Sequence, residues 1–487
     1  MTAISIGATK FDGPVSLPLA KANRHGLVTG STGGGKTATL QRLAEMFSKN
    51  GVPVFASDVK GDLSGIAAKA DTHGKAAERA QALGQAFVPH ACPTLFWDLF
   101  GANGLPIHTS VQSMGAELLS RMLRLNETQS GAMAIAFRKA NDDEAWMLTL
   151  DDLRWTLNDM LENRADVSAK YGNVTASSIS AIQRNILALE AQGGDRLFGE
   201  PPFDVLDFMR TDSQGHGMVN LLHADQLMEA PKLYATFLLW LLTELFRKLP
   251  EVGDIDKPKL VFFFDEAHLL FNDAPKPLTQ QVERLVRLVR SKGVGVFFVT
   301  QSPADVPDTI LAQLGSRIQH ALRAYTPKDQ RLVRASAQAF RPNKDIDVKS
   351  LITELGVGQA LISVLDDEGT PSPVQLIKVY SPQGQMGPIS DLERQTLLES
   401  SDLRQKYAAG VSDLIALHRF TRRQRIARGL DAGPLDPPPP GPPINIDEFI
   451  PDFSEAGPRR YPWIFRSVWN FYLVFVPVVA FVAYVAA

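Results

Sequence analysis

Residues 30–37 read GSTGGGKT, which fits the phosphate-binding pattern GxxxxGK[ST]. Glycines let successive backbone N–H groups surround a triphosphate because no Cβ blocks the approach, and a following helix adds the positive end of its dipole. In this pattern Lys36 reaches the β- and γ-phosphates, and the Thr37 hydroxyl ligates Mg²⁺. The pattern therefore predicts that ATP and Mg²⁺ bind at Gly30, Ser31, Thr32, Gly33, Gly34, Gly35, Lys36, Thr37 and Ala38.

A pair of acidic residues follows the apolar run LVFFF at 260–264. A nucleotide hydrolase needs a carboxylate at the end of a neighbouring strand, because the phosphate loop alone holds Mg²⁺ from one side only and activates no water. Asp265 is the candidate metal ligand, and Glu266 is the candidate general base. The alternative is that both acids only complement the dipole at the N-terminus of a helix.

Gln301 follows the next apolar run, at 294–299. If that run is the strand beside the one that carries the acidic pair, the amide lies at its tip and can contact the γ-phosphate or the attacking water. The alternative is that Gln301 caps the following turn together with Ser302 and Pro303.

The elements that must position these residues alternate between strands and helices. The pattern of apolar residues predicts helices at 38–49, 231–248 and 278–292, and strands at 26–29, 52–56, 94–97, 218–222, 259–264, 294–300 and 318–324. Strands joined by helical crossovers form parallel sheets, so the chain is predicted to have an α/β fold with a mostly parallel sheet and helices on both faces. Two further runs, at 360–364 and 373–379, are predicted to form a hairpin.

Changes in composition divide the chain into segments. An N-terminal β-hairpin is expected at 1–25, and the core at 26–109 and 211–381 is interrupted by a helical insertion at 110–210. The core is followed by a helical extension at 382–433, a proline-rich linker at 434–445, a juxtamembrane segment at 446–466 and a transmembrane tail at 467–487.

The tail is predicted from its length and its lack of charge. Its 21 residues contain no Asp, Glu, Lys or Arg, and as a helix they span about 30 Å, the thickness of a bilayer core. Arg459, Arg460 and Arg466 precede it, so the positive-inside rule places the preceding domain in the cytoplasm, anchored to the inner membrane. The alternative is a buried terminal strand or helix.

Bulk composition narrows the classes of protein further. A net charge of −3 excludes a strongly basic nucleic-acid binder, so a polyanion could bind only a local patch. Cys92 is the single cysteine, which excludes an intrachain disulfide and fits a reducing compartment. The N-terminus lacks the basic and apolar regions of a signal peptide, which also indicates a cytoplasmic main body.

Taken together, the motifs resemble those of bacterial HerA-like ATPases of the YjgR type, in the HerA/FtsK group of ring-forming P-loop motors. The resemblance rests on the phosphate loop and on DVKGDLSG at 58–65, FFFDEAHLLF at 262–271, RLVRSKGVGVFFVTQSPADVP at 287–307 and QLGSRIQHALRAYTP at 313–327. It implies a RecA-like P-loop NTPase core with an additional strand, ATP hydrolysis at subunit interfaces and a homo-oligomer in the form of a hexameric ring.

The resemblance also implies roles for single residues. Lys36, Thr37, Asp265, Glu266 and Gln301 match nucleotide-site residues. Arg317 matches an arginine that reaches a neighbouring subunit's site, and Lys292 is a second candidate of this kind. Asp58, at a strand end close to the loop, is expected to line the same site, although a purely turn-forming role is open.

Several functions follow from this resemblance. The first is an ATP-hydrolysing DNA translocase or helicase-like motor that holds the DNA backbone through a few basic side chains. The alternative is a membrane-tethered ATPase of the secretion or pilus type that acts on protein substrates, which the tail favours. Intact Glu266 argues against a third reading, a nucleotide-gated scaffold. Only 25 residues precede Gly26, so the N-terminal barrel of archaeal HerA and the nuclease partnership that it supports are not expected.

Overall fold

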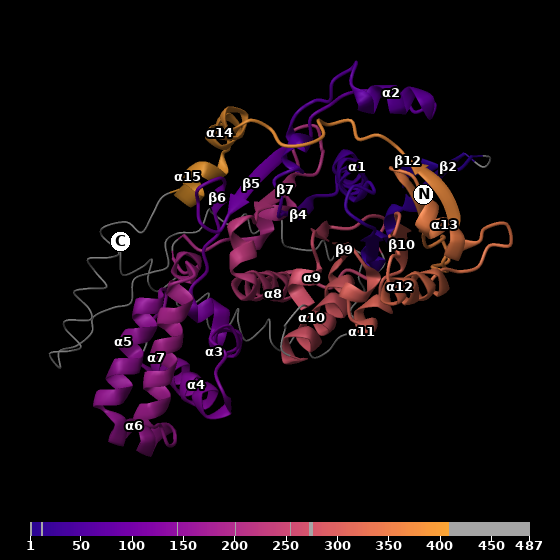
Figure 1. Ribbon diagram of the computed structural model, residues 1–487. Helices are drawn as coiled ribbons and strands as arrows, with labels where there is room; N and C mark the ends of the chain where they lie inside the picture. Colours follow the sequence, from indigo (N-terminus) through magenta and orange to yellow (C-terminus); the bar gives the residue numbers. More distant parts are fainter. Residues whose placement is uncertain are drawn as a thin grey trace, which may run out of the picture. The chain divides into compact units, whose positions relative to one another are not determined.

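The computed structural model describes residues 2–10, 13–143, 145–199, 201–253, 255–271 and 276–408. Its centre is a twelve-stranded mixed sheet with the strand order β2-β1-β12-β11-β10-β3-β9-β8-β4-β7-β5-β6 (Figure 1). The strands are β1 Ala3–Ala8, β2 Pro14–Pro18, β3 Gly26–Thr29, β4 Val54–Asp58, β5 Thr94–Asp98, β6 Leu105–Pro106, β7 Val219–His223, β8 Leu260–Phe264, β9 Val294–Thr300, β10 Ser316–Gln319, β11 Gln359–Ser363 and β12 Gln375–Val379.

The strands from β10 to β6 in this order run parallel, and β11, β12, β1 and β2 continue the sheet in antiparallel pairs. The helices are α1 Lys36–Lys49, α2 Lys75–Ala82, α3 Val111–Met122, α4 Glu127–Asp142, α5 Leu150–Glu162, α6 Arg164–Tyr171, α7 Ala176–Glu190, α8 Pro231–Lys248, α9 His268–Phe271, α10 Lys276–Val289, α11 Asp308–Leu311, α12 Pro327–Gln338, α13 Val348–Glu354, α14 Asp391–Glu399 and α15 Leu403–Ala408. The predicted α/β fold with a largely parallel sheet is confirmed.

Aromatic residues on β8 and β9 show how the two faces of the sheet are covered. Phe263 and Phe297 point to the face covered by α1, where their rings lie 6.2 and 6.0 Å from the ring of Phe47. Phe262 and Phe298 point to the opposite face and join a core that includes α8 and α10. Central parallel strands are buried on both faces, which explains why these segments read as unbroken apolar runs.

One predicted strand extends well beyond the end of the observed one. The strand expected at 318–324 ends at Gln319 as part of β10. Beyond it, the backbone turns towards the phosphate loop: His320 N donates to Thr29 O at 2.7 Å, and Ser31 N donates to Ala321 O at 2.8 Å. The prediction beyond Gln319 was wrong because these hydrogen bonds hold the loop and do not extend the sheet.

Helices α3 to α7 lie between β6 and β7 in the sequence. Figure 1 shows α4, α5, α6 and α7 as a bundle away from the sheet, with α3 between them and α8. Capping boxes fix two of the helix starts, one formed by Asn126 and Gln129 and the other by Thr149 and Asp152. The insertion is therefore joined to the core through α3 and through the segment after α7, where Phe208 packs on Phe55 and Trp97.

The apolar helix α8 is a core element. Its residues Phe237 and Leu241 are fully buried. Within the residues that the structure describes, no helix combines the length and apolar character that a membrane span requires. The predicted linker at 434–445, the juxtamembrane segment at 446–466 and the tail at 467–487 lie outside the described residues, as does the helical extension from residue 409 on.

Candidate nucleotide site

The phosphate loop joins β3 to α1, in the place that the sequence pattern predicts. Gly35 precedes the helix with φ of +110°, a left-handed conformation that favours glycine. A Cβ on Gly30 would lie 2.5 Å from the Cβ of His320, and one on Gly35 would lie 3.1 Å from Gly358 N. Glycines are therefore needed both for the turn and for the close packing of its neighbours.

Lys36 follows the glycines of the phosphate loop, and its side chain contacts the backbone of that loop. Its Nζ donates to Gly30 O at 2.6 Å and to Ser31 O at 3.3 Å. Burial lowers the pKa of Lys36, while the charges of Glu266 and Asp265 oppose that effect. Both acids act electrostatically on this lysine, so the two motifs lie close to one another.

The strand order explains why the motifs meet. β9 lies between β3 and β8, and the three strands are parallel, so their carboxyl ends reach the same edge of the sheet. Asp265 N donates to Ser57 Oγ at 3.2 Å, which ties the turn after β8 to β4. Burial raises the pKa of Asp265 to about 6, and the neighbouring Glu266 charge adds to this effect.

Glu266 is held by contacts on both carboxylate oxygens. Its φ is +47°, and its side chain is buried. Oε1 is in an ion pair with Lys60, and Oε2 lies 3.3 Å from His268 Nδ1 without a hydrogen bond from any described residue. Burial acts to raise the pKa of Glu266, but the hydrogen bond and charge of Lys60 outweigh it and hold that pKa below its usual range.

Two aspartates, one at the end of β4 and one in the turn that follows, complete the acidic part of the site. Asp58 Oδ2 accepts a hydrogen bond from Leu63 N at 3.2 Å, and Asp62 Oδ2 accepts one from Thr37 Oγ1 at 3.3 Å. Burial raises the pKa of Asp58 to about 7, helped by the charges of Asp62 and Asp265. Among the described residues, the second oxygens of Asp58 and Asp62 are buried and accept no hydrogen bond.

These residues fit Mg²⁺ together with a nucleotide. In the part of the chain that is described, no three His, Cys, Asp or Glu side chains form a ready metal cage. Mg²⁺ in nucleotide sites commonly keeps several waters and takes one or two protein ligands beside the phosphates, so Thr37 and Asp265 suffice as protein ligands. The free oxygens of Asp58 and Asp62 suit donors such as metal-bound waters. When bound, the ion neutralises phosphate charge.

Gln301 follows β9 at the same edge of the sheet and is exposed. The turn after it has its own cap, because Asp305 Oδ2 accepts hydrogen bonds from Thr300 Oγ1 at 2.6 Å and from Ser302 N at 3.0 Å. Ser302 Oγ in turn accepts from Ala304 N at 3.3 Å. The turn is therefore capped by Ser302 and Asp305, which leaves the Gln301 amide available at the edge.

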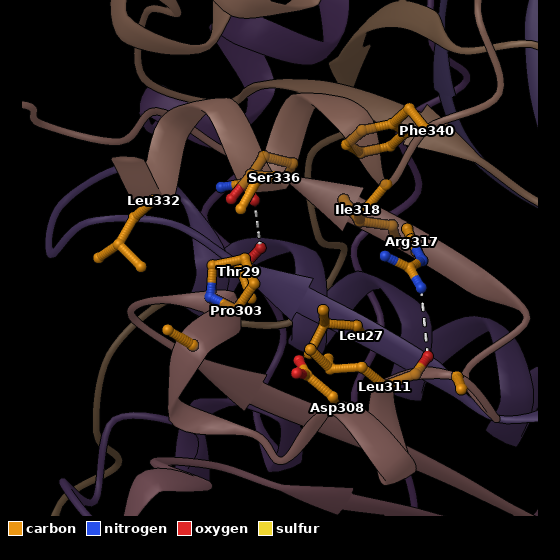
Figure 2. Close-up of a pocket in the computed structure, with 15 residues that line it drawn as sticks. Leu27, Thr29, Pro303, Asp308, Leu311, Arg317, Ile318, Leu332, Ser336 and Phe340 are labelled. Atoms are coloured by element: carbon orange, nitrogen blue, oxygen red, sulfur yellow. Dashed lines mark hydrogen bonds between the residues drawn. The ribbon is translucent and has the colours of Figure 1, made fainter. Parts of the chain in front are cut away.

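Arg317 is not in the phosphate pocket of its own chain. It lies on β10, and its Nη2 donates to Leu311 O at 3.2 Å, beside a cavity of about 350 Å³ (Figure 2). The cavity also contacts Leu27 and Thr29 on β3 and Phe340 beyond α12. Leu27 packs in the core on the face opposite α1, so Arg317, its neighbour on β10, belongs to that face. Burial lowers its pKa.

Lys292 lies at the opposite edge of the sheet from the phosphate loop. It precedes β9, whose seven residues span about 23 Å before Gln301. Its Nζ lies 4.0 Å from Glu251 Oε1 and 5.0 Å from the ring centroid of Phe246. The structure thus brings together Lys36, Thr37, Asp58, Asp265 and Glu266, with Gln301 at the same edge, but not Arg317 or Lys292.

Lys60 and Asp62 were missed as site residues in the sequence analysis. The contact of Lys60 with Glu266 joins residues 206 positions apart, and that of Asp62 with Thr37 joins residues 25 apart. The available signal was the run of charges in DVKGD, which begins at the last residue of the strand at 54–58. A charged turn at the carboxyl end of a parallel strand beside the acidic strand could have indicated them.

Comparison with known proteins identifies the family of the chain. The family model described as Helicase HerA-like C-terminal matches residues 3–425. The protein named "Probable helicase MJECL08" from Methanocaldococcus jannaschii is 28% identical over 144 residues, which are 29% of this chain and 25% of that protein. The chain thus matches only about a quarter of that relative's length.

Two solved structures of the plasmid coupling protein TrwB share the fold. The complex with a non-hydrolysable ATP analogue has a TM-score of 0.52 and 14% identity, and the match covers 79% of this chain and 95% of that one. The complex with ADP and Mg²⁺ has a TM-score of 0.51 and 15% identity and covers 79% and 90%. Because the family model matches most of its length, this chain belongs to the family of HerA-like helicase C-terminal domains, which implies an NTP hydrolase.

Proposed function

We propose that the chain is an ATP-hydrolysing motor of the YjgR type that uses Mg²⁺ and works as a ring. Its proposed substrate is DNA, along which it acts as a translocase or helicase-like motor. The observation that carries the proposal is the convergence of Lys36 and Thr37 with Asp265 and Glu266 at one edge of the sheet. TrwB structures with an ATP analogue and with ADP and Mg²⁺ support the choice of ligands.

In this proposal each residue has one role. Lys36 binds the β- and γ-phosphates, Thr37 and Asp265 hold Mg²⁺, and Glu266 accepts a proton from the attacking water. Gln301 orients that water or the terminal phosphate. The glycines, Ser31, Thr32 and Ala38 supply backbone around the phosphates, while Asp58 borders the metal site. Arg317 and Lys292 lie outside the pocket, so they act only on a neighbouring subunit.

The role of Glu266 gives a direct test. Glu266→Gln removes the base but keeps the size of the side chain, so ATP binding is retained while hydrolysis falls by at least about a hundredfold. Steady-state ATPase rates and retention of radiolabelled ATP on the purified chain measure both effects. Glu229→Gln, an exposed position far from the motifs in sequence, is the matched control. Hydrolysis at the parent rate in Glu266→Gln would refute the assignment of the base.

DNA as the substrate is tested by stimulation of hydrolysis. ATPase rates of the full chain are measured without DNA and with single- or double-stranded DNA at about 50 mM and about 200 mM salt, because phosphate contacts weaken steeply over this range. A motor that moves on DNA is stimulated several-fold at the lower salt and less at the higher salt. The absence of stimulation in both conditions would remove DNA from the proposal but leave the ATPase.

The second candidate is a membrane-tethered ATPase that acts on protein substrates, with its ATPase domain in the cytoplasm and the tail in the inner membrane. It is favoured by the uncharged sequence at 467–487. A chain without residues 434–487 separates the two readings. Strong DNA stimulation of this shortened chain supports the DNA motor, whereas none, together with membrane association of the full chain only, supports the second candidate.

A further inference from the structure

The contact between Lys60 and Glu266 occupies one carboxylate oxygen of the candidate base. Glu266 Oε1 is paired with the Lys60 ammonium, and a carboxylate in such a pair is a weaker acceptor for a proton from water. If Glu266 is the base of the proposed ATPase, on which this inference rests, the pair must open before hydrolysis. The question is which group then takes the place of Glu266 beside Lys60.

The turn that carries Lys60 is fastened on both sides. Asp58 Oδ2 accepts from Leu63 N at 3.2 Å, and Gly61 O accepts from Ser64 Oγ at 2.9 Å. Asp62 Oδ2 accepts from Thr37 Oγ1 at 3.3 Å, which joins the turn to the phosphate loop. The backbone of Lys60 is thus held between the two motifs, while its long side chain can still change partner.

The exposures of the two side chains show which one can change partner. The Lys60 side chain is 52% exposed, whereas that of Glu266 is only 4% exposed. Lys60 therefore reaches into the space at the edge of the sheet, and Glu266 is fixed at its base. An anion that enters the pocket meets the ammonium first.

Two lysines share this space. Lys60 lowers the pKa of Lys36, so the two ammonium groups lie close enough to repel one another. Asp265 and Glu266 act on both lysines. When Glu266 is released, the Lys60 charge needs another anion near Lys36, and the terminal phosphate of a triphosphate is the anion that Lys36 draws to this place.

We infer that Lys60 is a further catalytic residue, which leaves Glu266 and binds the terminal phosphate of the bound nucleotide. The exchange couples two events: the terminal phosphate gains a second lysine, and the base becomes free only when that phosphate is present. A diphosphate does not reach Lys60, so the Lys60–Glu266 pair stays closed with ADP. Lys60 thereby distinguishes ATP from ADP at the same site.

The test measures affinity and not turnover. Binding of ADP and of a non-hydrolysable ATP analogue, each with Mg²⁺, is measured by calorimetry on the full parent chain and on Lys60→Met, Lys60→Arg and the exposed control Lys69→Met. Lys60→Met is expected to weaken binding of the ATP analogue at least about tenfold and binding of ADP by less than about twofold. The reason is that one charge-assisted hydrogen bond is lost with the analogue only. Lys60→Arg keeps most of the difference, and Lys69→Met changes neither affinity.

A second comparison tests the exchange itself. Glu266→Gln removes the competing charge, so its affinity for the ATP analogue should rise above that of the parent, and this gain should vanish in the double variant Lys60→Met, Glu266→Gln. Equal loss of both nucleotides in Lys60→Met, or no loss of either, overturns the inference and leaves Lys60 as a partner of Glu266 only, with the ATPase intact. A parent chain that binds neither nucleotide refutes the proposed ATPase and the inference with it.

Discussion

At the scale of single residues, Asp58 is a carboxyl group whose charged form is destabilised by its surroundings. The carboxyl group is 3% exposed, and one of its oxygens accepts no hydrogen bond from the described residues. Burial, with Asp62 and Asp265 nearby, raises its pKa from 3.8 to about 7. Without metal or donors from a ligand, the folded protein therefore binds a proton at Asp58 more tightly than the unfolded chain does.

Because proton binding at Asp58 is coupled to folding, Asp58→Asn is predicted to stabilise the ligand-free protein more at pH 8 than at pH 5. A raised folded-state pKa means that the destabilisation by the charged carboxylate appears as the pH rises from 3.8 and is complete above about 7. The rise in the pKa corresponds to a destabilisation of at most about 4 kcal/mol. Asparagine avoids this destabilisation, and its amide oxygen can still accept a hydrogen bond from Leu63 N.

Urea unfolding of both proteins at the two pH values, without Mg²⁺ or nucleotide, measures the effect. The same difference in unfolding free energy at pH 5 and pH 8 would contradict the raised pKa. In the presence of Mg²⁺ and nucleotide the advantage of asparagine should shrink, since the ligands supply donors and positive charge.

At the scale of elements, the segment 381–389 ties the far side of the sheet to α1. It runs from β12 past α1 to α14 (Figure 1). The buried side chain of Glu45 on α1 accepts hydrogen bonds from Gln383 N and Gly384 N, each at 2.8 Å. Because α1 begins at the phosphate loop, the segment 381–389 helps to hold the helix whose N-terminus forms the site.

Glu45→Ala is predicted to lower the free energy of unfolding by about 2–4 kcal/mol, because two buried N–H groups lose their acceptor. Glu45→Gln, which keeps one acceptor oxygen, should recover part of this loss. Glu399→Ala, whose side chain is 53% exposed, is the control and should change stability by less than about 0.5 kcal/mol. Urea unfolding measures all three. If Glu45→Ala lowered the free energy of unfolding no more than the control, the contacts of Glu45 with the segment 381–389 would contribute nothing to stability.

The same scale shows what the sequence could predict. β3 and β9 were predicted with the bounds that the structure shows, because parallel strands buried on both faces give unbroken apolar runs between polar turns. The end of β10 was missed, since Ala321 and Leu322 beyond it are also apolar, but the backbone of Ala321 is hydrogen-bonded to the phosphate loop. The acidic pair and the loop were predictable from local patterns, whereas the Lys60 pair depends on which strands become neighbours.

At the scale of the whole molecule, the position of Arg317 bears on assembly. Its guanidinium binds Leu311 O on the face of the sheet opposite α1, while Lys36 lies in the phosphate loop. A residue that acts on phosphate from such a position can do so only for another copy of the chain. If the proposed ring forms, each nucleotide site would then combine Lys36 of one subunit with Arg317 of the next.

This arrangement predicts that two inactive variants complement one another. Lys36→Ala removes the cis lysine, and Arg317→Ala removes the trans arginine, so each alone is expected to lose at least about a hundredfold in ATPase rate. In an equal mixture of exchanging subunits, about a quarter of the interfaces pair an intact Lys36 with an intact Arg317. ATPase activity of the mixture should therefore recover to a comparable fraction of the parent rate, and the same pairing with Lys292→Ala tests the second candidate. If Arg317 acted within its own subunit, no interface would regain both groups, and the mixture would stay as inactive as its parts.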